Sequence, residues 1–137
     1  MTPSAILESA LYVADLDAAE AFYAEVLGLE RIAKVGGRHV FFRCGSGVLL
    51  LFQPDATVVP PPADASLPVP PHGTRGQGHL CFAATAAEID RWKADLQARD
   101  VAIEADFEWP QGGRSIYFRD PSGNSLEFAE PRIWGIA

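Results

Sequence analysis

Three polar side chains interrupt apolar stretches of the sequence, where a charged group is costly to bury without a partner. Glu8 lies within ILESALYV (residues 6–13), His79 opens HLCFAA, and Glu127 lies within SLEF. One imidazole and two carboxylates could bind a single divalent cation, and coordination would compensate the cost of burying them. Three protein ligands leave positions open for substrate, as in a catalytic site. Taken singly, a glutamate in a strand is more often an edge or solvent-facing residue, and a single histidine is more often a half-buried side chain, than a metal ligand.

An internal repeat in the sequence gives a separate argument about Glu127. Residues 36–52 (GGRHVFFRCGSGVLLLF) and 112–128 (GGRSIYFRDPSGNSLEF) share nine of 17 residues without gaps, at an offset of 76. Each copy indicates a hairpin, with an aromatic strand, a turn at Ser-Gly and a second strand. In this alignment Glu127 corresponds to Leu51. A position that accepts leucine in one copy has no packing reason for a carboxylate in the other, so chemistry is the favoured explanation. Two arginines occur at the same positions in both copies, and this recurrence favours a structural role for all four: Arg38 with Arg114, and Arg43 with Arg119.

The elements that must position these residues also occur twice. In the first half, alternation over residues 6–13 predicts a strand with Glu8, Ala10 and Tyr12 on one face. A helix is predicted over 15–27, with a capping box from Asp17 to Glu20 and a stop at Gly28. A short strand is predicted near 30–34, ahead of the hairpin.

In the second half, a strand is predicted over 79–84. Thr85 and Glu88 form a second capping box, and the helix that follows has an apolar face of Ile89, Trp92 and Leu96. A short strand is predicted near 103–107. We therefore predict an α+β fold of two tandem βαβββ modules, in which Glu8 and His79 occupy equivalent first-strand positions.

The predicted organisation is one domain spanning 1–137, with module one at 5–53 and module two at 76–130. The connector, 54–75, holds seven prolines and shows no helical or strand period. Such a segment is typical of a semi-extended linker. Long loops inside compact domains also serve as lids, and both interpretations remain open.

These motifs resemble those of the vicinal oxygen chelate superfamily, which includes glyoxalases, bleomycin-resistance proteins, extradiol dioxygenases and fosfomycin-resistance thiol transferases. The resemblance covers about residues 5–130, and its most specific part runs from Phe118-Arg119-Asp120-Pro121 through Gly123-Asn124 to Glu127. It implies curved sheets around a metal-binding cleft, with Glu8, His79 and Glu127 as ligands. The glyoxalase pattern has a fourth ligand on the last strand of module one, which the repeat alignment assigns to Leu51. The sequence therefore departs from the four-ligand pattern.

The resemblance and the residue types together predict one divalent ion, Mn²⁺, Fe²⁺, Zn²⁺ or Mg²⁺. Glu8 and Glu127 are also the candidate catalytic residues, since a ligating carboxylate could act as a base. The candidate substrate-pocket residues are aromatic or histidine side chains near the predicted cleft, and each is also typical of an aromatic core or an exposed loop: Tyr12, His39, Phe52, His72, Trp109 and Tyr117.

The composition limits the classes of partner that the protein is expected to bind. The net charge is −7 and no basic run is present, which argues against nucleic acid. No apolar run approaches the roughly 20 residues of a membrane span, and no signal peptide is recognisable. Cys44 and Cys81 form neither a disulfide framework nor a metal knuckle. We therefore expect a cytoplasmic protein that binds a small molecule and, by family resemblance, forms a homodimer.

Two functions remain open at this point. One is a metal-dependent enzyme that acts on an oxygen-bearing small molecule as a lyase, isomerase, thiol transferase or dioxygenase. The other is a metal-free binding or drug-sequestering protein of the bleomycin-resistance type. The three candidate ligands favour the enzyme.

Overall fold

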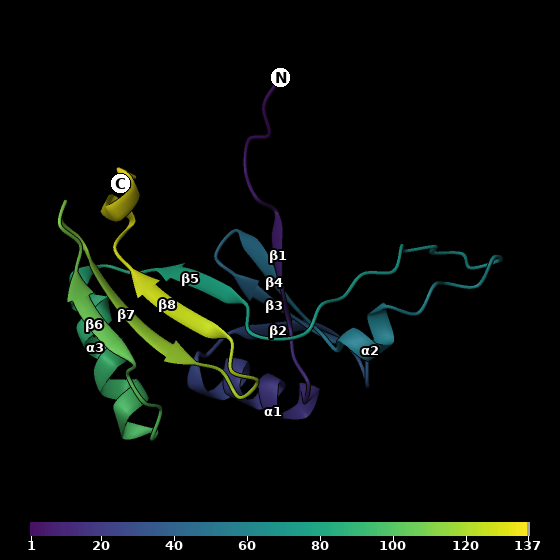
Figure 1. Cartoon of the computed structure of the whole chain (residues 1–137), viewed down its shortest axis with the longest axis horizontal. Coiled ribbons are helices and arrows are strands. Elements are labelled where there is room, and N and C mark those ends of the chain that lie inside the picture. Colours follow the sequence, from purple (N-terminus) through teal and green to yellow (C-terminus); the bar gives the residue numbers. More distant parts are fainter. Residues whose placement is uncertain (137) are drawn as a thin grey trace. The chain divides into compact units, whose positions relative to one another are not determined.

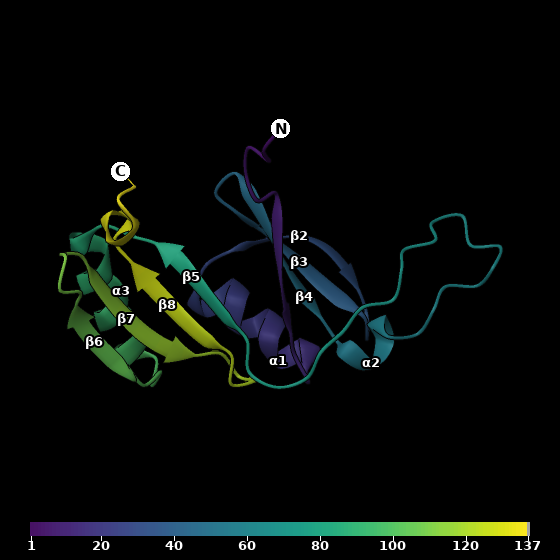
Figure 2. The same ribbon diagram turned by 45° about the horizontal axis from the view of Figure 1, so that its top comes forward.

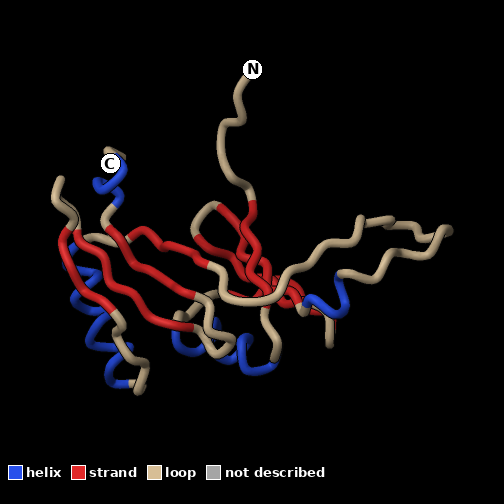
Figure 3. Tube along the Cα trace, viewed as in Figure 1, coloured by secondary structure: helices blue, strands red, loops and turns tan. Residues whose placement is uncertain are grey.

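The computed structural model describes residues 1–136, and the chain divides into two compact units, Met1–Gly76 and Gln77–Ala137 (Figure 1). Each unit contains one four-stranded mixed sheet and the helices that pack on it (Figure 3). The predicted α+β fold of two βαβββ modules is confirmed. Over residues 1–136 no helix is long and apolar enough to span a membrane.

The first unit has the sheet order β1-β4-β3-β2, in which β1 runs parallel to β4 and the other neighbours are antiparallel. Its elements in chain order are β1 (Glu8–Tyr12), α1 (Leu16–Ala21), the π-helical turn η1 (Phe22–Val26), β2 (Glu30–Val35), β3 (His39–Cys44), β4 (Gly47–Phe52) and α2 (Pro54–Thr57).

The second unit repeats this topology, with the order β5-β8-β7-β6 and β5 parallel to β8. Its elements are β5 (His79–Ala83), α3 (Ala86–Ala98), β6 (Ala105–Glu108), β7 (Arg114–Arg119), β8 (Ser125–Ala129) and the 3₁₀ turn η2 (Pro131–Trp134). In Figure 2, α3 lies along one face of its sheet.

Alternation along the strands gives each sheet a core face and an opposite face. In the first unit α1 packs on β3 and β4, and Tyr23 lies 6.1 Å from Phe42 between ring centroids. In the second unit Trp92 of α3 stacks on Phe128 of β8 at 4.6 Å. The side chains on the opposite face of each sheet are therefore the ones left to form a site.

The helix starts were predicted with partial success. Thr85 and Glu88 form the predicted capping box, and each satisfies a backbone N–H of the other residue. The capping box from Asp17 to Glu20 is wrong: Asp15 caps α1 by accepting from Ala18 N at 3.0 Å. Glu20 instead pairs with two basic side chains of β2, at 2.6 Å from each.

The connector contains more structure than its prolines suggested. It begins with the short helix α2, where Pro54 occupies the first turn and needs no hydrogen-bonded N–H. The rest runs out as a long loop and returns towards the first sheet (Figure 2). Several contacts hold the returning end: His72 N donates to Thr57 O, the Tyr12 hydroxyl bonds to His72, the His72 ring packs on Phe52, and Arg75 pairs with Asp55.

Candidate functional site

The candidate ligands lie on equivalent strands of the two units. Glu8 opens β1 in the first unit, and His79 opens β5 in the second. The ladders pair Glu8 with Val48 of β4 and His79 with Ser125 of β8. Glu127, at the centre of β8, lies in the same unit as His79 and on the same face of its sheet.

His79 and Glu127 are in contact, with 3.3 Å between Nε2 and Oε2. Nδ1 of His79 lies 3.0 Å from the carbonyl oxygen of Ser125. Because a carbonyl oxygen only accepts, Nδ1 carries a proton there. In the neutral imidazole, Nε2 then presents a lone pair to the carboxylate. A cation bound to both atoms, or a second proton on the ring, relieves this contact.

Glu127 is only 5% exposed, and its Oε1 atom is buried with no hydrogen-bond partner among residues 1–136. An unsatisfied buried carboxylate oxygen is costly. Carboxylate oxygen and imidazole nitrogen are suitable ligands for Zn²⁺, Mn²⁺ or Fe²⁺. Two such ligands at about 2.1 Å from one ion are separated by roughly 3.0–3.4 Å, so the observed pair fits a divalent ion. Among residues 1–136, however, no group of three His, Cys, Asp or Glu side chains forms a complete site.

Two weak acids lie next to Glu127 on the same face of the sheet. Cys81 of β5 and Tyr117 of β7 are its direct cross-strand partners. Burial, reinforced by the adjacent Glu127 carboxylate, raises the pKa of Cys81 to about 12 and that of Tyr117 to about 12. Both groups are therefore protonated at neutral pH and can donate to a carboxylate or to a substrate oxygen.

The turn before β8 positions His79. Asp120 accepts from the backbone N–H of Ser122 and of Asn124, both at 2.9 Å. Asn124 in turn accepts from Gly78 N at 2.7 Å, directly before His79. Asp120 and Asn124 are buried. This most specific part of the sequence motif therefore has a structural role, which is to join the start of β5 to β8.

The ladders correct the repeat alignment at one point. Tyr117 pairs with Glu127, and its equivalent Phe41 pairs with Leu50. The structural equivalent of Glu127 is therefore Leu50 rather than Leu51. The β7–β8 turn is one residue longer than the β3–β4 turn, which changes the offset from 76 to 77. Leu51 is fully buried in the core, whereas Leu50 lies on the face of the sheet that carries Glu8. The fourth-ligand position of module one is apolar in either alignment.

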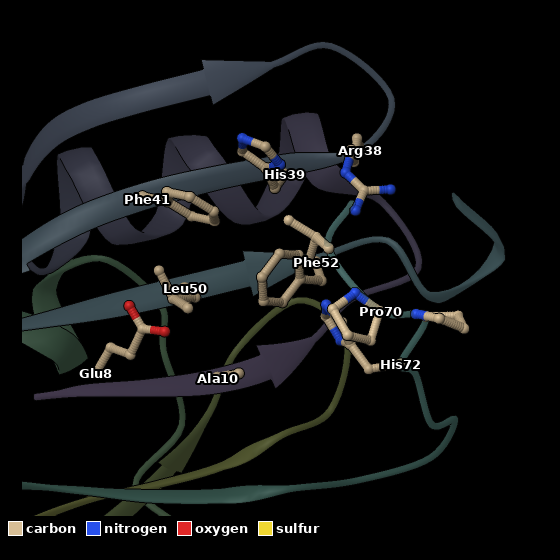
Figure 4. A pocket seen from close by; sticks show the side chains of 11 residues that line it. Glu8, Ala10, Arg38, His39, Phe41, Leu50, Phe52, Pro70 and His72 are labelled. Carbon is tan, nitrogen blue, oxygen red and sulfur yellow. The ribbon is translucent and has the colours of Figure 1, made fainter. Parts of the chain in front are cut away.

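The first unit contains a cavity of about 600 Å³ on the face that carries Glu8 (Figure 4). Figure 4 shows Glu8 at one end and Arg38 with His39 towards the other, with Phe41, Leu50 and Phe52 between them. The connector forms one wall. The lining residues are Glu8, Ala10, Arg38, His39, Phe41, Leu50, Phe52, Val69, Pro70, Pro71 and His72.

Four of the six candidate pocket residues lie at this cavity. His39, Phe52 and His72 line it, and Tyr12 bonds to His72 with 2.6 Å between Oη and Nδ1. Phe41, Leu50 and the connector residues 69–71 also line the cavity and were not predicted from the sequence. Phe41 and Leu50 could have been found from strand alternation with His39 and Phe52, whereas the irregular connector carries no such signal.

The other two candidates lie in the second unit. Trp109 donates through Nε1 to Ser115 Oγ at 2.8 Å and contacts Phe107. Tyr117 stacks on Phe107 and on His79. They form an aromatic surface beside His79 and Glu127.

His39 has an unusual environment. Its ring stacks on Phe41 at 4.1 Å between centroids, and its Nδ1 atom is buried with no hydrogen-bond partner among the described residues. Burial, with a smaller contribution from the Arg38 charge, lowers the pKa of His39. The imidazole is therefore neutral at neutral pH.

Comparisons with known proteins agree with this fold. A family model described as the Glyoxalase/Bleomycin resistance protein/Dioxygenase superfamily matches residues 5–128. A comparison with curated proteins found no match. Among solved structures, a lactoylglutathione lyase from Agrobacterium tumefaciens is 50% identical, with a TM-score of 0.92 over 99% of this chain and 100% of that one.

Two other solved structures are more distant. A virulence protein from Salmonella typhimurium is 27% identical, with a TM-score of 0.69 over 95% of this chain and 98% of that one. A genomically encoded fosfomycin resistance protein from Listeria monocytogenes is 22% identical, with a TM-score of 0.68 over 94% of each chain, and shows the fold alone. The family match covers nearly the whole chain and confirms the resemblance seen in the sequence. The chain therefore belongs to the glyoxalase/bleomycin resistance protein/dioxygenase superfamily.

Proposed function

We propose that the chain is a metal-dependent enzyme whose single divalent ion is held by His79, Glu127 and Glu8. The main support for this proposal is the buried Glu127 carboxylate. One of its oxygens has no hydrogen-bond partner among residues 1–136, and the other lies 3.3 Å from His79 Nε2. Glu8 is proposed as the third ligand because it is the register equivalent of His79. When bound, such an ion supplies Lewis-acid polarisation of a substrate oxygen.

The protein's own groups have distinct roles in this proposal. Glu127, buried at the centre of β8, orients one oxygen towards His79 and keeps the other available to take up a proton. The Nδ1 contact of His79 with Ser125 fixes the ring so that Nε2 is the binding atom. Tyr117 and Cys81 stay protonated and can donate to developing negative charge.

Among the reactions open to the superfamily, we propose a lyase or isomerase reaction on an oxygen-bearing small molecule. The support is the 50% identity to a lactoylglutathione lyase over nearly the whole of both chains. Leu50 at the fourth-ligand position distinguishes this chain from the four-ligand glyoxalase pattern. The substrate therefore need not be that of the relative.

The test combines metal content with turnover. Protein purified without chelators should contain about one divalent ion per chain by elemental analysis. Metal-loaded protein should then be assayed with S-lactoylglutathione, diketones, thiols with epoxides, and catechols. Turnover that is lost with EDTA and restored by one metal supports the proposal. Absence of metal binding by the folded protein would contradict it.

The alternative, a metal-free binding protein, is supported by the cavity of the first unit, because its aromatic lining requires no metal. In that case a small molecule should bind equally well with and without EDTA, and no ion should co-purify.

We also propose a homodimer, since symmetric dimers are the commonest oligomers. A monomeric mass at micromolar concentration would argue against it.

A further inference from the structure

The cavity of the first unit has two chemically different ends. His39 is the first residue of β3 and Arg38 directly precedes it, and His39 pairs with Phe52 at the end of β4. Glu8 pairs with Val48, four residues earlier on β4. Four residues of strand correspond to about 13 Å. The apolar side chains of Phe41, Leu50 and Phe52 lie between the two ends (Figure 4).

Arg38 brings a positive charge to the cavity. Its guanidinium donates once, to the carbonyl oxygen of Ala56 at 3.2 Å. Within residues 1–136 it forms no ion pair, whereas Arg43, further along β3, pairs with Glu30. A cation that lines a cavity without a carboxylate partner favours an anionic ligand.

His39 adds a hydrogen-bond donor of defined position. A buried N–H without an acceptor is costlier and rarer than a buried lone pair, so the proton of the neutral ring belongs on Nε2. Protonating the ring would place an N–H on the buried Nδ1 atom, where the described residues provide no acceptor. His39 therefore offers Nε2–H, and an acceptor oxygen of the ligand is its complement.

We propose that the cavity is a binding site for small carboxylic acids, with the carboxylate held by Arg38 and His39 Nε2–H and the apolar body packed on Phe41 and Phe52. The Glu8 carboxylate at the far end repels a second negative charge and fixes the orientation of the ligand. If the proposed function is correct, the end of the substrate near Glu8 carries the oxygens that bind the ion. The substrates would then be acids with an apolar spacer and a distal oxygen group. The proposal rests on the proposed function only for that distal end.

The connector completes the site. Val69, Pro70 and Pro71 form a wall against which an apolar ligand can pack, and the bond between Tyr12 and His72 holds this wall in place. Proline side chains lose little conformational entropy when they pack against a ligand.

The test uses the metal-free full-length chain, with 3-phenylpropionate and 3-phenyl-1-propanol as matched probes in calorimetric titration. We expect the acid to bind about tenfold more tightly than the alcohol, because only the acid makes charge-assisted hydrogen bonds. His39→Phe keeps the stacking on Phe41 and should reduce this preference to about twofold or less, as should Arg38→Gln. Arg43→Gln removes a charge from the same strand outside the cavity and should retain the full preference.

A second measurement needs no variant. Long-range ¹H–¹⁵N NMR of the wild-type histidine rings should show His39 protonated on Nε2, and its signal should shift when 3-phenylpropionate is added. A proton on Nδ1, equal affinity for the two probes, or an unchanged preference in both cavity variants would overturn the proposal. Acid binding without metal binding would refute the proposed function alone. Metal binding without acid preference would refute this site alone.

Discussion

Nε2 of His79 lies 3.3 Å from Oε2 of Glu127, while Nδ1 of the same ring contacts the Ser125 carbonyl oxygen. The backbone contact fixes the ring so that its basic nitrogen meets a buried carboxylate. Without a cation or a second proton this contact is unfavourable. The same two atoms at this separation can share one ion.

Replacing Glu127 with leucine should abolish divalent-metal binding while the fold is retained. Leu50 shows that the equivalent position of module one accepts this side chain. The metal-free variant should gain about 1 kcal/mol of unfolding free energy, because an unpartnered buried carboxylate oxygen is removed. Calorimetric metal titration and urea unfolding measure the two effects. Glu104→Leu, at an exposed ion pair with Arg119, is the control and should bind metal like the parent. Metal affinity unchanged in Glu127→Leu would exclude Glu127 as a ligand.

Replacing Asn124 with alanine should destabilise the protein by about 1–3 kcal/mol, because the buried Asp120 carboxylate and the Gly78 N–H each lose a hydrogen bond. His79 follows Gly78 directly, so metal affinity should fall as well. Urea unfolding and metal titration report both quantities. The control is Ser46→Ala in the corresponding turn of module one, which should leave both nearly unchanged. A stability loss with unaltered metal affinity would show that the turn does not position His79.

The stabilising contribution of Asp106 should be lost in acid. Hydrogen bonds from Arg114, and then from Lys93, hold the pKa of this carboxyl well below its usual range. Its stabilising contribution is therefore complete above about pH 4, the unfolded-state value, and is lost as the pH falls towards the lower folded-state pKa. Asp106→Asn should accordingly lower Tm at pH 7 and have a smaller effect at pH 2.5. Asp64→Asn in the connector should have little effect at either pH. If Asp106→Asn lowers Tm by as much at pH 2.5 as at pH 7, the lowered pKa of Asp106 does not contribute to stability in this way.

Replacing Tyr12 with phenylalanine should loosen the returning end of the connector. The variant removes the hydroxyl that bonds to His72 Nδ1, a contribution of about 0.5–1.5 kcal/mol. Hydrogen exchange of the His72 amide, which donates to Thr57 O, should accelerate by up to about tenfold. Tyr117→Phe in the second unit should leave this amide unchanged. Equal exchange rates in parent and Tyr12→Phe would mean that other contacts hold the connector.

The fold could be predicted because its signals are local and occur twice. Strand alternation placed Glu8, Ala10 and Tyr12 on one face of β1, and Glu8 and Ala10 line the cavity on that face. The capping box at Thr85 was correct for the same reason. At α1 two acidic residues, Asp15 and Asp17, compete for the cap position, and the sequence alone does not decide between them.

The repeat alignment failed where one extra residue lies in the β7–β8 turn. The Ser-Gly pairs at 46–47 and 122–123 still align without a gap, which hides the insertion. Because side chains alternate along a strand, a shift of one residue exchanges the two faces, and the gapless alignment therefore matches Glu127 to Leu51 instead of Leu50. The connector wall could not be predicted, since a proline-rich segment has no period that assigns its residues to a face.

The most direct measurement is a crystal structure of the protein soaked with Mn²⁺ or Zn²⁺, with the ion located by anomalous diffraction. We expect one strong peak per chain, with ligand atoms of Glu127, His79 and Glu8 at about 2.0–2.2 Å and the remaining positions held by water or substrate. Absence of a peak between His79 and Glu127 in a protein that binds the metal in solution, or a Glu8 side chain that faces away from the ion, would contradict it.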